Sequence, residues 1–233
     1  MYKDRRILAV VPARAHYDKI DELNLKKLGG NPLISYTLQA TQKSKYLDKV
    51  IVSTEDSFIA DIADSYGASV PFLRPEKLVK LGITTAQVAK HVIESISDEF
   101  DIVIILLPNA PFRTSEIIDD AIEFMIKNEF QKVRGVTEKT DYFLCEKEDT
   151  FVTLNSELNI EDNTFISLFT VGGGIYLYER DQLFKDNDCD ESYGNFVINE
   201  HNARLIRSLY DLLIAERLIK LNQSLVDSLI NST

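Results

Sequence analysis

Three arginines stand where an expected strand or a proline-flanked turn could present a basic side chain to an anion: Arg14, Arg74 and Arg113. A guanidinium carries a fixed fork of donors that fits a phosphate or a carboxylate. Arg14 follows the apolar run 7–11, and a polar loop then leads to the glycines of residues 29–32 and an amphipathic segment. A buried strand that leads into a charged loop and then a helix is how α/β proteins present phosphate-binding groups. The sequence therefore predicts an anion site, and Arg14 is its first candidate contact.

Arg74 and Arg113 have a structural alternative of equal weight. Each lies in a turn flanked by proline. An arginine in such a turn also serves to hold the loop by donating hydrogen bonds to backbone carbonyls. Arg14 is the stronger functional candidate because it ends the first expected strand. His16 lies in the same loop and is the histidine that we would test as a ligand contact.

Apolar runs alternate with helical periodicities through the first two thirds of the chain. Strands are expected over residues 7–11, 49–53, 69–72, 102–107 and 132–136, and helices over residues 32–44, 57–66, 86–97 and 115–128. Asp56 and Thr114 are the expected N-caps of the second and fourth helices. Short β-rich runs separated by helices predict βαβ units. The expected fold class is therefore α/β and Rossmann-like, with a mostly parallel twisted sheet flanked by helices.

The last third of the chain has a different pattern. Residues 141–167 scatter polar and aromatic side chains without a clear period, residues 172–178 indicate a glycine-led strand, and residues 209–221 indicate an amphipathic helix. No repeat or low-complexity stretch interrupts the chain. We therefore expect residues 1–233 to form a single domain.

The composition excludes several classes of partner. The net charge is −11, with 26 basic and 37 acidic residues, which argues against a nucleic-acid-binding surface. No stretch reaches the length of a membrane span, and the apolar run 7–11 is too short for a signal peptide. The two cysteines, Cys145 and Cys189, form neither a metal motif nor a disulfide framework. We expect a cytoplasmic protein with no membrane partner.

Ordered motifs are spaced along most of the chain. They are PAR at 12–14 with GGNPLISYT at 29–37, VIVSTED at 50–56, VPFLRP at 70–75, LLPNAPFRT at 106–114, GGGIY at 172–176 and DLLIAE at 211–216. In this order the motifs resemble those of the CMP-sugar synthetases, the acylneuraminate cytidylyltransferases among the sugar nucleotidyltransferases. The resemblance implies the nucleotidyltransferase fold. It also implies a small β-rich arm, about residues 141–170, that joins two subunits into a homodimer.

The resemblance also implies a reaction and its site. A cytidylyl group would pass from CTP to an acidic sugar of the sialic acid or nonulosonate type, giving a CMP-sugar and pyrophosphate, with Mg²⁺ as the family's cofactor. Such phosphoryl chemistry relies on positioning and on cations. By resemblance Arg14 and Lys19 are the catalytic residues that bind the phosphates, and the other nucleotide- or substrate-binding residues are Asn24, Arg74, Arg113 and His16.

The chain departs from the family's motifs at positions that carry this chemistry. Asp18 stands where the family has its first loop lysine, and Lys19 beside it is the substitute cation. Leu107 stands where the family has the glutamine that reads the nucleotide, and Gly172 where it has an asparagine. The chain keeps the order and spacing of the family's motifs. Because of these departures, the motifs alone do not decide whether the chain is catalytically active.

The expected metal ligands also differ. The family's pair of magnesium-binding aspartates corresponds to Leu205 and Arg207. Magnesium needs hard oxygen ligands, so Asp18 or Glu22 would have to hold it, while residues 199–202 are expected to form a polar turn. Because cations and metal ligands are lost together, a second function stays open. It is a catalytically degenerate relative that acts as a ligand-binding or protein-interaction module.

Overall fold

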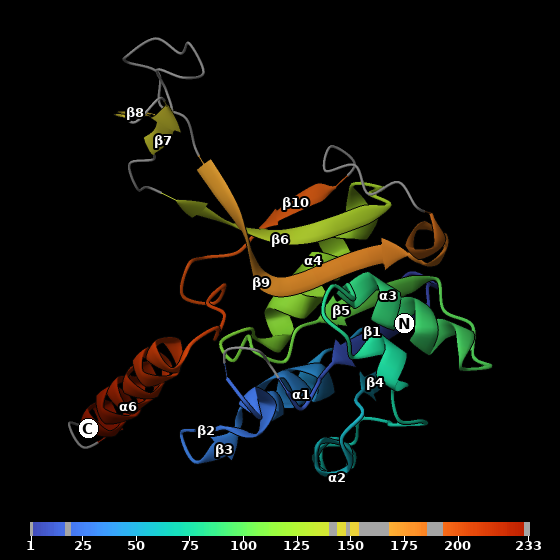
Figure 1. Ribbon diagram of the computed structural model, residues 1–233, viewed down its shortest axis with the longest axis horizontal. Coiled ribbons are helices and arrows are strands. Elements are labelled where there is room, and N and C mark those ends of the chain that lie inside the picture. The colour runs from blue at the N-terminus through green and yellow to red at the C-terminus, as the bar shows by residue number, and fades with distance from the viewer. Residues whose placement is uncertain are drawn as a thin grey trace.

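A six-stranded mixed sheet forms the centre of the computed structural model, which describes residues 2–16, 20–139, 144–147, 150–153, 168–185 and 193–230. Within these residues the strand order is β10-β6-β9-β5-β1-β4. The strands are β1 (Ile7–Pro12), β4 (Lys49–Ser53), β5 (Ile102–Leu106), β6 (Lys132–Lys139), β9 (Leu168–Glu179) and β10 (Gly194–Val197). β9 runs antiparallel to β5 and β6, and the other neighbouring pairs are parallel. The expected Rossmann-like α/β fold is confirmed (Figure 1).

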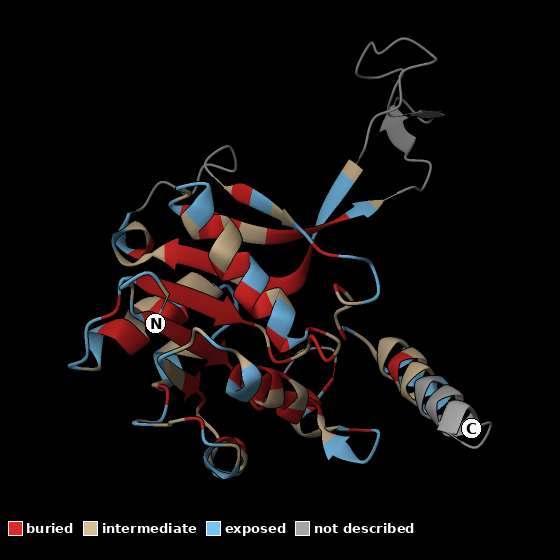
Figure 2. Cartoon of the chain, turned by 180° about the vertical axis from the view of Figure 1, so that it is seen from behind, coloured by how far each residue is buried: buried red, intermediate tan, exposed pale blue. Residues whose placement is uncertain are grey.

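Helices cover both faces of the sheet. They are α1 (Leu33–Lys43), α2 (Ser57–Ser65), α3 (Thr85–Glu94) and α4 (Ser115–Lys127). Ile7 and Ala9 of β1 pack with α1, α2 and α4, whereas Leu8 and Val10 pack with α3 on the other face. Successive side chains of a strand point to opposite faces, so one apolar run supplies both layers of the core. Figure 2 shows the central strands buried along most of their length.

Several of the expected elements have other bounds in the structure, and one expected strand is absent. Residues 69–72 form no strand: Ser69 alone makes a parallel bridge, to Ile51 of β4. Pro71 lies two residues after Ser69, and proline has no backbone N–H to donate to a neighbouring strand. The prediction of a strand over residues 69–72 was therefore wrong. The helix expected over 86–97 begins at Thr85 and ends at Glu94.

The helix starts follow the expected capping chemistry. The Asp56 carboxylate accepts a hydrogen bond from the Ile59 amide, and the Thr114 hydroxyl accepts one from the Ile117 amide, so both expected N-caps are confirmed. A third cap was not expected. Thr84 and Gln87 form a reciprocal capping box at the start of α3.

Two elements extend from the body of the molecule. The strands β7 (Leu144–Lys147) and β8 (Thr150–Thr153) form a hairpin that lies beyond the ends of β6 and β9 in Figure 1. The helix α6 (Leu209–Ile230) projects from another side, starting where the expected helix starts. The hairpin falls in the expected arm of about residues 141–170. Residues 141–143, 148–149 and 154–167 of that arm lie outside the described residues. No helix in the described part of the chain is long and apolar enough to cross a membrane.

Candidate functional site

The carboxyl ends of β1, β4 and β5 meet at one edge of the sheet. Ligands of open α/β sheets bind outside this edge. The loop after β1 is fastened there, because the Ala13 amide donates to the Ser53 carbonyl over 2.9 Å. The Ala15 amide donates to Glu55 Oε1, just beyond β4, over 2.7 Å. Arg14 lies between these two contacts and is therefore held at the edge where a ligand is expected.

Asn24 holds the backbone at Arg14 through a hydrogen bond from its side chain. The Asn24 side chain is fully buried, and its Nδ2 donates to the Arg14 carbonyl over 2.8 Å. Its Oδ1 is buried without a hydrogen-bond partner among the described residues. Asn24 thus lies beside the loop with an acceptor still available, and its expected role in nucleotide binding stays a prediction. Asp18 and Lys19 lie outside the described residues, so their expected roles stay predictions.

His16 and Asp21 form an exposed ion pair in the same loop, with 2.5 Å between Nδ1 and Oδ1. The hydrogen bond to Asp21, followed by its charge, raises the pKa of His16 above the ordinary 6.5. A raised folded pKa means that the pair stabilises the loop below the unfolded pKa of His16. This contribution is lost as the pH rises through the folded value.

We predict that an NMR titration will give His16 a pKa above 6.5, and that Asp21→Asn will lower it toward that value. His91 is an internal control. Burial, and then the charge of Lys77, lowers the pKa of His91, which Asp21→Asn should leave unchanged. A His16 pKa at or below the ordinary value in the unmodified protein would contradict the ion pair.

Arg74 is buried against the end of β4. Its Nε donates to Ser53 Oγ over 3.1 Å, and its Nη2 donates to the Ser53 carbonyl. Its Nη1 lies 3.9 Å from Glu55 Oε2. These contacts agree with the loop-holding alternative, and they place the guanidinium beside the carboxylate that fastens Ala15.

Arg113 is buried at the centre of the same edge, with 2 % of its surface exposed. Its Nη1 donates to the carbonyls of Gly173 and Gly174 over 2.8 and 2.9 Å. Its Nη2 donates to Thr37 Oγ1 over 2.9 Å and to the Leu107 carbonyl over 3.0 Å. Burial lowers the pKa of Arg113 to about 9. The guanidinium therefore donates to two backbone segments and to the Thr37 hydroxyl, which agrees with the loop-holding alternative rather than with an exposed nucleotide contact.

The glycine segment of β9 that Arg113 holds brings two departures from the family motifs together. Gly173 and Gly174 both have left-handed φ angles, +71° and +58°. A Cβ at Gly174 would lie 2.9 Å from Leu107 Cβ and 3.2 Å from Leu205 Cδ2. Leu107 and Leu205 thus flank the same glycine. Two positions that are polar in the family form an apolar wall here.

The residues at the expected metal positions do not fit magnesium. Leu205 and Arg207 offer no oxygen ligand from their side chains. Asp211 accepts from the Arg207 amide over 2.8 Å and from Ser208 Oγ over 2.9 Å, and Glu200 pairs with Lys139. Among the described residues no group of three or more His, Cys, Asp or Glu side chains could hold a metal ion. The expected polar turn at 199–202 is confirmed, because the Asn202 amide donates to Asn199 Oδ1.

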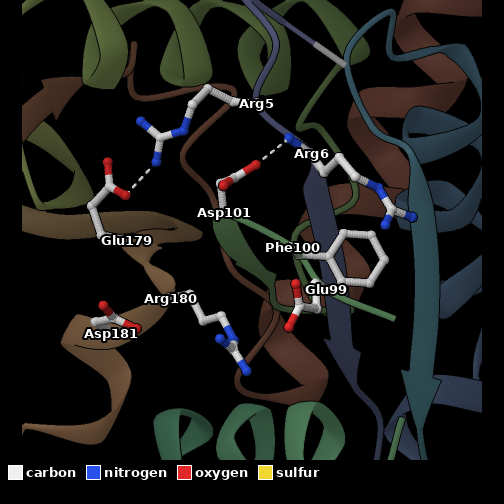
Figure 3. A pocket seen from close by; sticks show the side chains of 8 residues that line it. All are labelled: Arg5, Arg6, Glu99, Phe100, Asp101, Glu179, Arg180 and Asp181. Atoms are coloured by element: carbon white, nitrogen blue, oxygen red, sulfur yellow. Dashed lines mark hydrogen bonds and ion pairs between the residues drawn. The ribbon is translucent and has the colours of Figure 1, made fainter. Parts of the chain in front are cut away.

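A hollow of about 420 Å³ lies at the opposite edge of the sheet, beside the starts of β1 and β5 (Figure 3). Arg5 pairs there with Glu179, and the Arg6 amide donates to Asp101 Oδ2 over 2.7 Å. The Arg6 guanidinium lies 4.8 Å from the centre of the Phe100 ring. These contacts join the amino ends of the strands to one another. Because ligands of this kind of sheet bind at the carboxyl ends, we assign the hollow to packing.

The fold and the site define an α/β protein with its candidate ligand-binding residues at the carboxyl ends of the parallel strands. A family model described as cytidylyltransferase matches residues 8–205. The protein therefore belongs to the cytidylyltransferase family.

Relatives of similar length are found in bacteria. The chain is 30% identical to a CMP-N,N'-diacetyllegionaminic acid synthase of Legionella pneumophila, over 94% of this chain and 98% of the relative. It is 25% identical to a pseudaminic acid cytidylyltransferase of Campylobacter jejuni, over 92% of this chain and 97% of the relative. A solved CMP:2-keto-3-deoxy-manno-octonic acid synthetase in complex with CTP shares the fold, with a TM-score of 0.73 and 14% identity over 93% of this chain and 99% of that one.

Tyr176 is a candidate that the sequence did not single out. It lies on β9 two residues after Gly174 and is half-buried. Burial raises the pKa of Tyr176, and the positive charges of Arg207 and Arg134 oppose that effect. Arg134 is the partner of Tyr176 in the register of β6 and β9. The GGGIY motif contains this tyrosine, but nothing in the motif indicates that Arg134 of β6 pairs with it.

Proposed function

We propose that the protein transfers a cytidylyl group from CTP to an acidic sugar of the nonulosonate type, releasing pyrophosphate. The observation that carries this proposal is the loop after β1, which holds Arg14 at the carboxyl edge in a chain whose relatives match it over nearly their whole length. Two of those relatives are named for CMP-legionaminic acid synthesis and for pseudaminic acid cytidylyl transfer. The acidic sugar is therefore the substrate class that we propose.

The reaction breaks a phosphoanhydride bond of CTP and forms a phosphoester bond to the sugar. A sugar hydroxyl attacks the α-phosphorus of CTP, the bond to the β-phosphate breaks, pyrophosphate leaves, and the hydroxyl proton passes to solvent. Arg14 would bind the phosphates through its fork of donors, with Lys19 as the second cation. Asn24 would act as a positioning residue, because it holds the Arg14 backbone. No step is assigned to magnesium, because Leu205 and Arg207 do not fit it.

The test is turnover with a defined panel. Purified protein is incubated with CTP and with sialic, legionaminic, pseudaminic and 3-deoxy-manno-octulosonic acids, each with and without magnesium. Pyrophosphate release and CMP-sugar mass are measured, and ATP, GTP and UTP serve as controls. We expect pyrophosphate and CMP-sugar in equal amounts with at least one acceptor. Binding of CTP without turnover over the whole panel would support the alternative, a ligand-binding or interaction module.

We further propose a homodimer formed through the hairpin of β7 and β8. An isolated two-stranded hairpin is marginally stable in water, so packing against a second copy would account for one that lies beyond the body. Light scattering should give the mass of two chains, and deletion of residues 141–167 should give that of one. The acidic net charge supports small-molecule rather than nucleic-acid partners. The cytoplasmic location stays a prediction.

A further inference from the structure

We infer that Arg207 replaces the divalent cation of the nucleotide site, so that this protein binds its nucleotide without magnesium. The inference rests on the proposed function, because it concerns how CTP is held at the same edge of the sheet. Four observations carry it: the position of residues 205–207, the apolar wall, the engagement of the nearby carboxylates, and the charge of the site.

The segment 205–207 is fixed at the carboxyl edge by its middle residue. Ile206 is fully buried, and its amide donates to the Asn109 carbonyl over 2.9 Å. Asn109 Nδ2 donates back to the Ile206 carbonyl over 2.9 Å. Leu205 and Arg207 flank this clamped residue, Leu205 partly exposed and Arg207 exposed. Both side chains are therefore presented by a segment clamped directly to the loop after β5.

The wall beside Arg207 offers no oxygen to a metal ion. Leu107 and Leu205 supply the three atoms that lie nearest to a Cβ placed at Gly174, and all three are carbons. The Gly174 and Leu107 carbonyls accept hydrogen bonds from Arg113. Magnesium keeps near-ideal octahedral oxygen coordination, and an apolar wall does not contribute to it.

Four carboxylates near this edge of the sheet already accept hydrogen bonds or form an ion pair. Glu55 accepts from the Ala15 amide, Asp56 caps α2, Glu200 pairs with Lys139, and Asp211 accepts from the Arg207 amide and Ser208. Each of these contacts uses one oxygen of its carboxylate, so a magnesium ligand recruited from this set would share its carboxylate with a contact that holds a loop, a helix start or a lysine.

The exchange of residue types also changes the charge of the site. A pair of carboxylates and one divalent cation cancel each other, whereas leucine and a guanidinium leave one positive charge. The Arg207 side chain is exposed and has no hydrogen-bond or ion-pair partner among the described residues. A guanidinium at this place attracts a polyphosphate directly and repels a divalent cation.

The experiment is calorimetric titration of the full chain with CTP, in excess magnesium and in EDTA. We expect the dissociation constants under the two conditions to agree within about threefold. Arg207→Ala should weaken binding in EDTA by about tenfold or more, the scale of one charge-assisted contact. The control Arg217→Ala removes an exposed guanidinium of α6 and should leave both constants unchanged.

A second variant restores carboxylates at positions 205 and 207 and tests whether magnesium dependence returns with them. Leu205→Asp with Arg207→Asp should make CTP binding depend on magnesium. It should also create a protein-bound Mn²⁺ signal in electron paramagnetic resonance that the unmodified protein lacks. If this double variant does not fold, Arg207→Glu alone serves, because it reverses the charge without touching the apolar wall.

The outcomes separate the inference from the proposed function. CTP binding that is about tenfold or more tighter with magnesium overturns the inference and leaves the proposed function standing. If Glu22→Gln abolishes that dependence, the metal belongs to the loop after β1. Absence of CTP binding under both conditions overturns the proposed function and the inference with it.

Discussion

Replacing Arg113 by methionine is expected to lower the free energy of unfolding by about 2–4 kcal/mol. The guanidinium is buried, and it donates hydrogen bonds to the Gly173 and Gly174 carbonyls of β9. It also donates to Thr37 of α1 and to the carbonyl of Leu107, the residue after β5. Methionine keeps much of the side-chain volume but donates no hydrogen bond. The buried Gly173 carbonyl would lose its donor, and an unpaired buried acceptor costs about 1–3 kcal/mol.

The expected loss is smaller than the sum of the lost hydrogen bonds for two reasons. The Gly174 carbonyl also accepts from the Leu107 amide, and the Leu107 carbonyl also accepts from Thr37 Oγ1, so both retain one partner. Removal of the guanidinium also relieves the cost of burying a charge that no carboxylate balances. Urea unfolding measures the result, with Arg217→Met on the exposed side of α6 as the matched control. Equal midpoints for the two variants would contradict the role of Arg113 as a loop-holding residue.

The strands near the site could be predicted because their signal is local. β1 and β5 are apolar runs buried along their whole length, and β4 has an apolar centre, so the sequence located each within one residue of its bounds. The length of β6 could not be predicted in this way. Its second half, up to Lys139, pairs with β9 residues about thirty positions further on, and this long-range pairing has no local sequence signal.

The candidate site was predictable in residue type but not in role. The motifs named all three arginines and favoured Arg14, yet only the fold shows that Arg113 donates to carbonyls of β9 that are sixty positions away. The same limit applies to Leu107 and Leu205. Their separate substitutions were visible in the sequence, whereas their shared contact with Gly174 depends on how β5, β9 and the segment after β10 come together.

Replacing Arg14 by alanine is expected to lower kcat/KM for CMP-sugar formation by about 10²–10³-fold, the cost of removing one donor group from developing charge. The structure fastens the backbone on both sides of Arg14 and through Asn24, so the loop should keep its course when only the side chain is removed. The loss should therefore appear in turnover and CTP affinity, with little change in the free energy of unfolding. Steady-state pyrophosphate release and urea unfolding measure the two quantities.

Two further variants sharpen the test of Arg14. Arg14→Lys keeps the charge but loses the planar fork, so it should recover only part of the activity, which distinguishes bidentate phosphate binding from simple charge attraction. Lys43→Ala, at the far end of α1 from the carboxyl edge, removes an exposed cation and should leave kcat/KM unchanged. Full activity of Arg14→Ala would move the phosphate contact to another cation, with Lys19 and Arg207 as the next residues to replace.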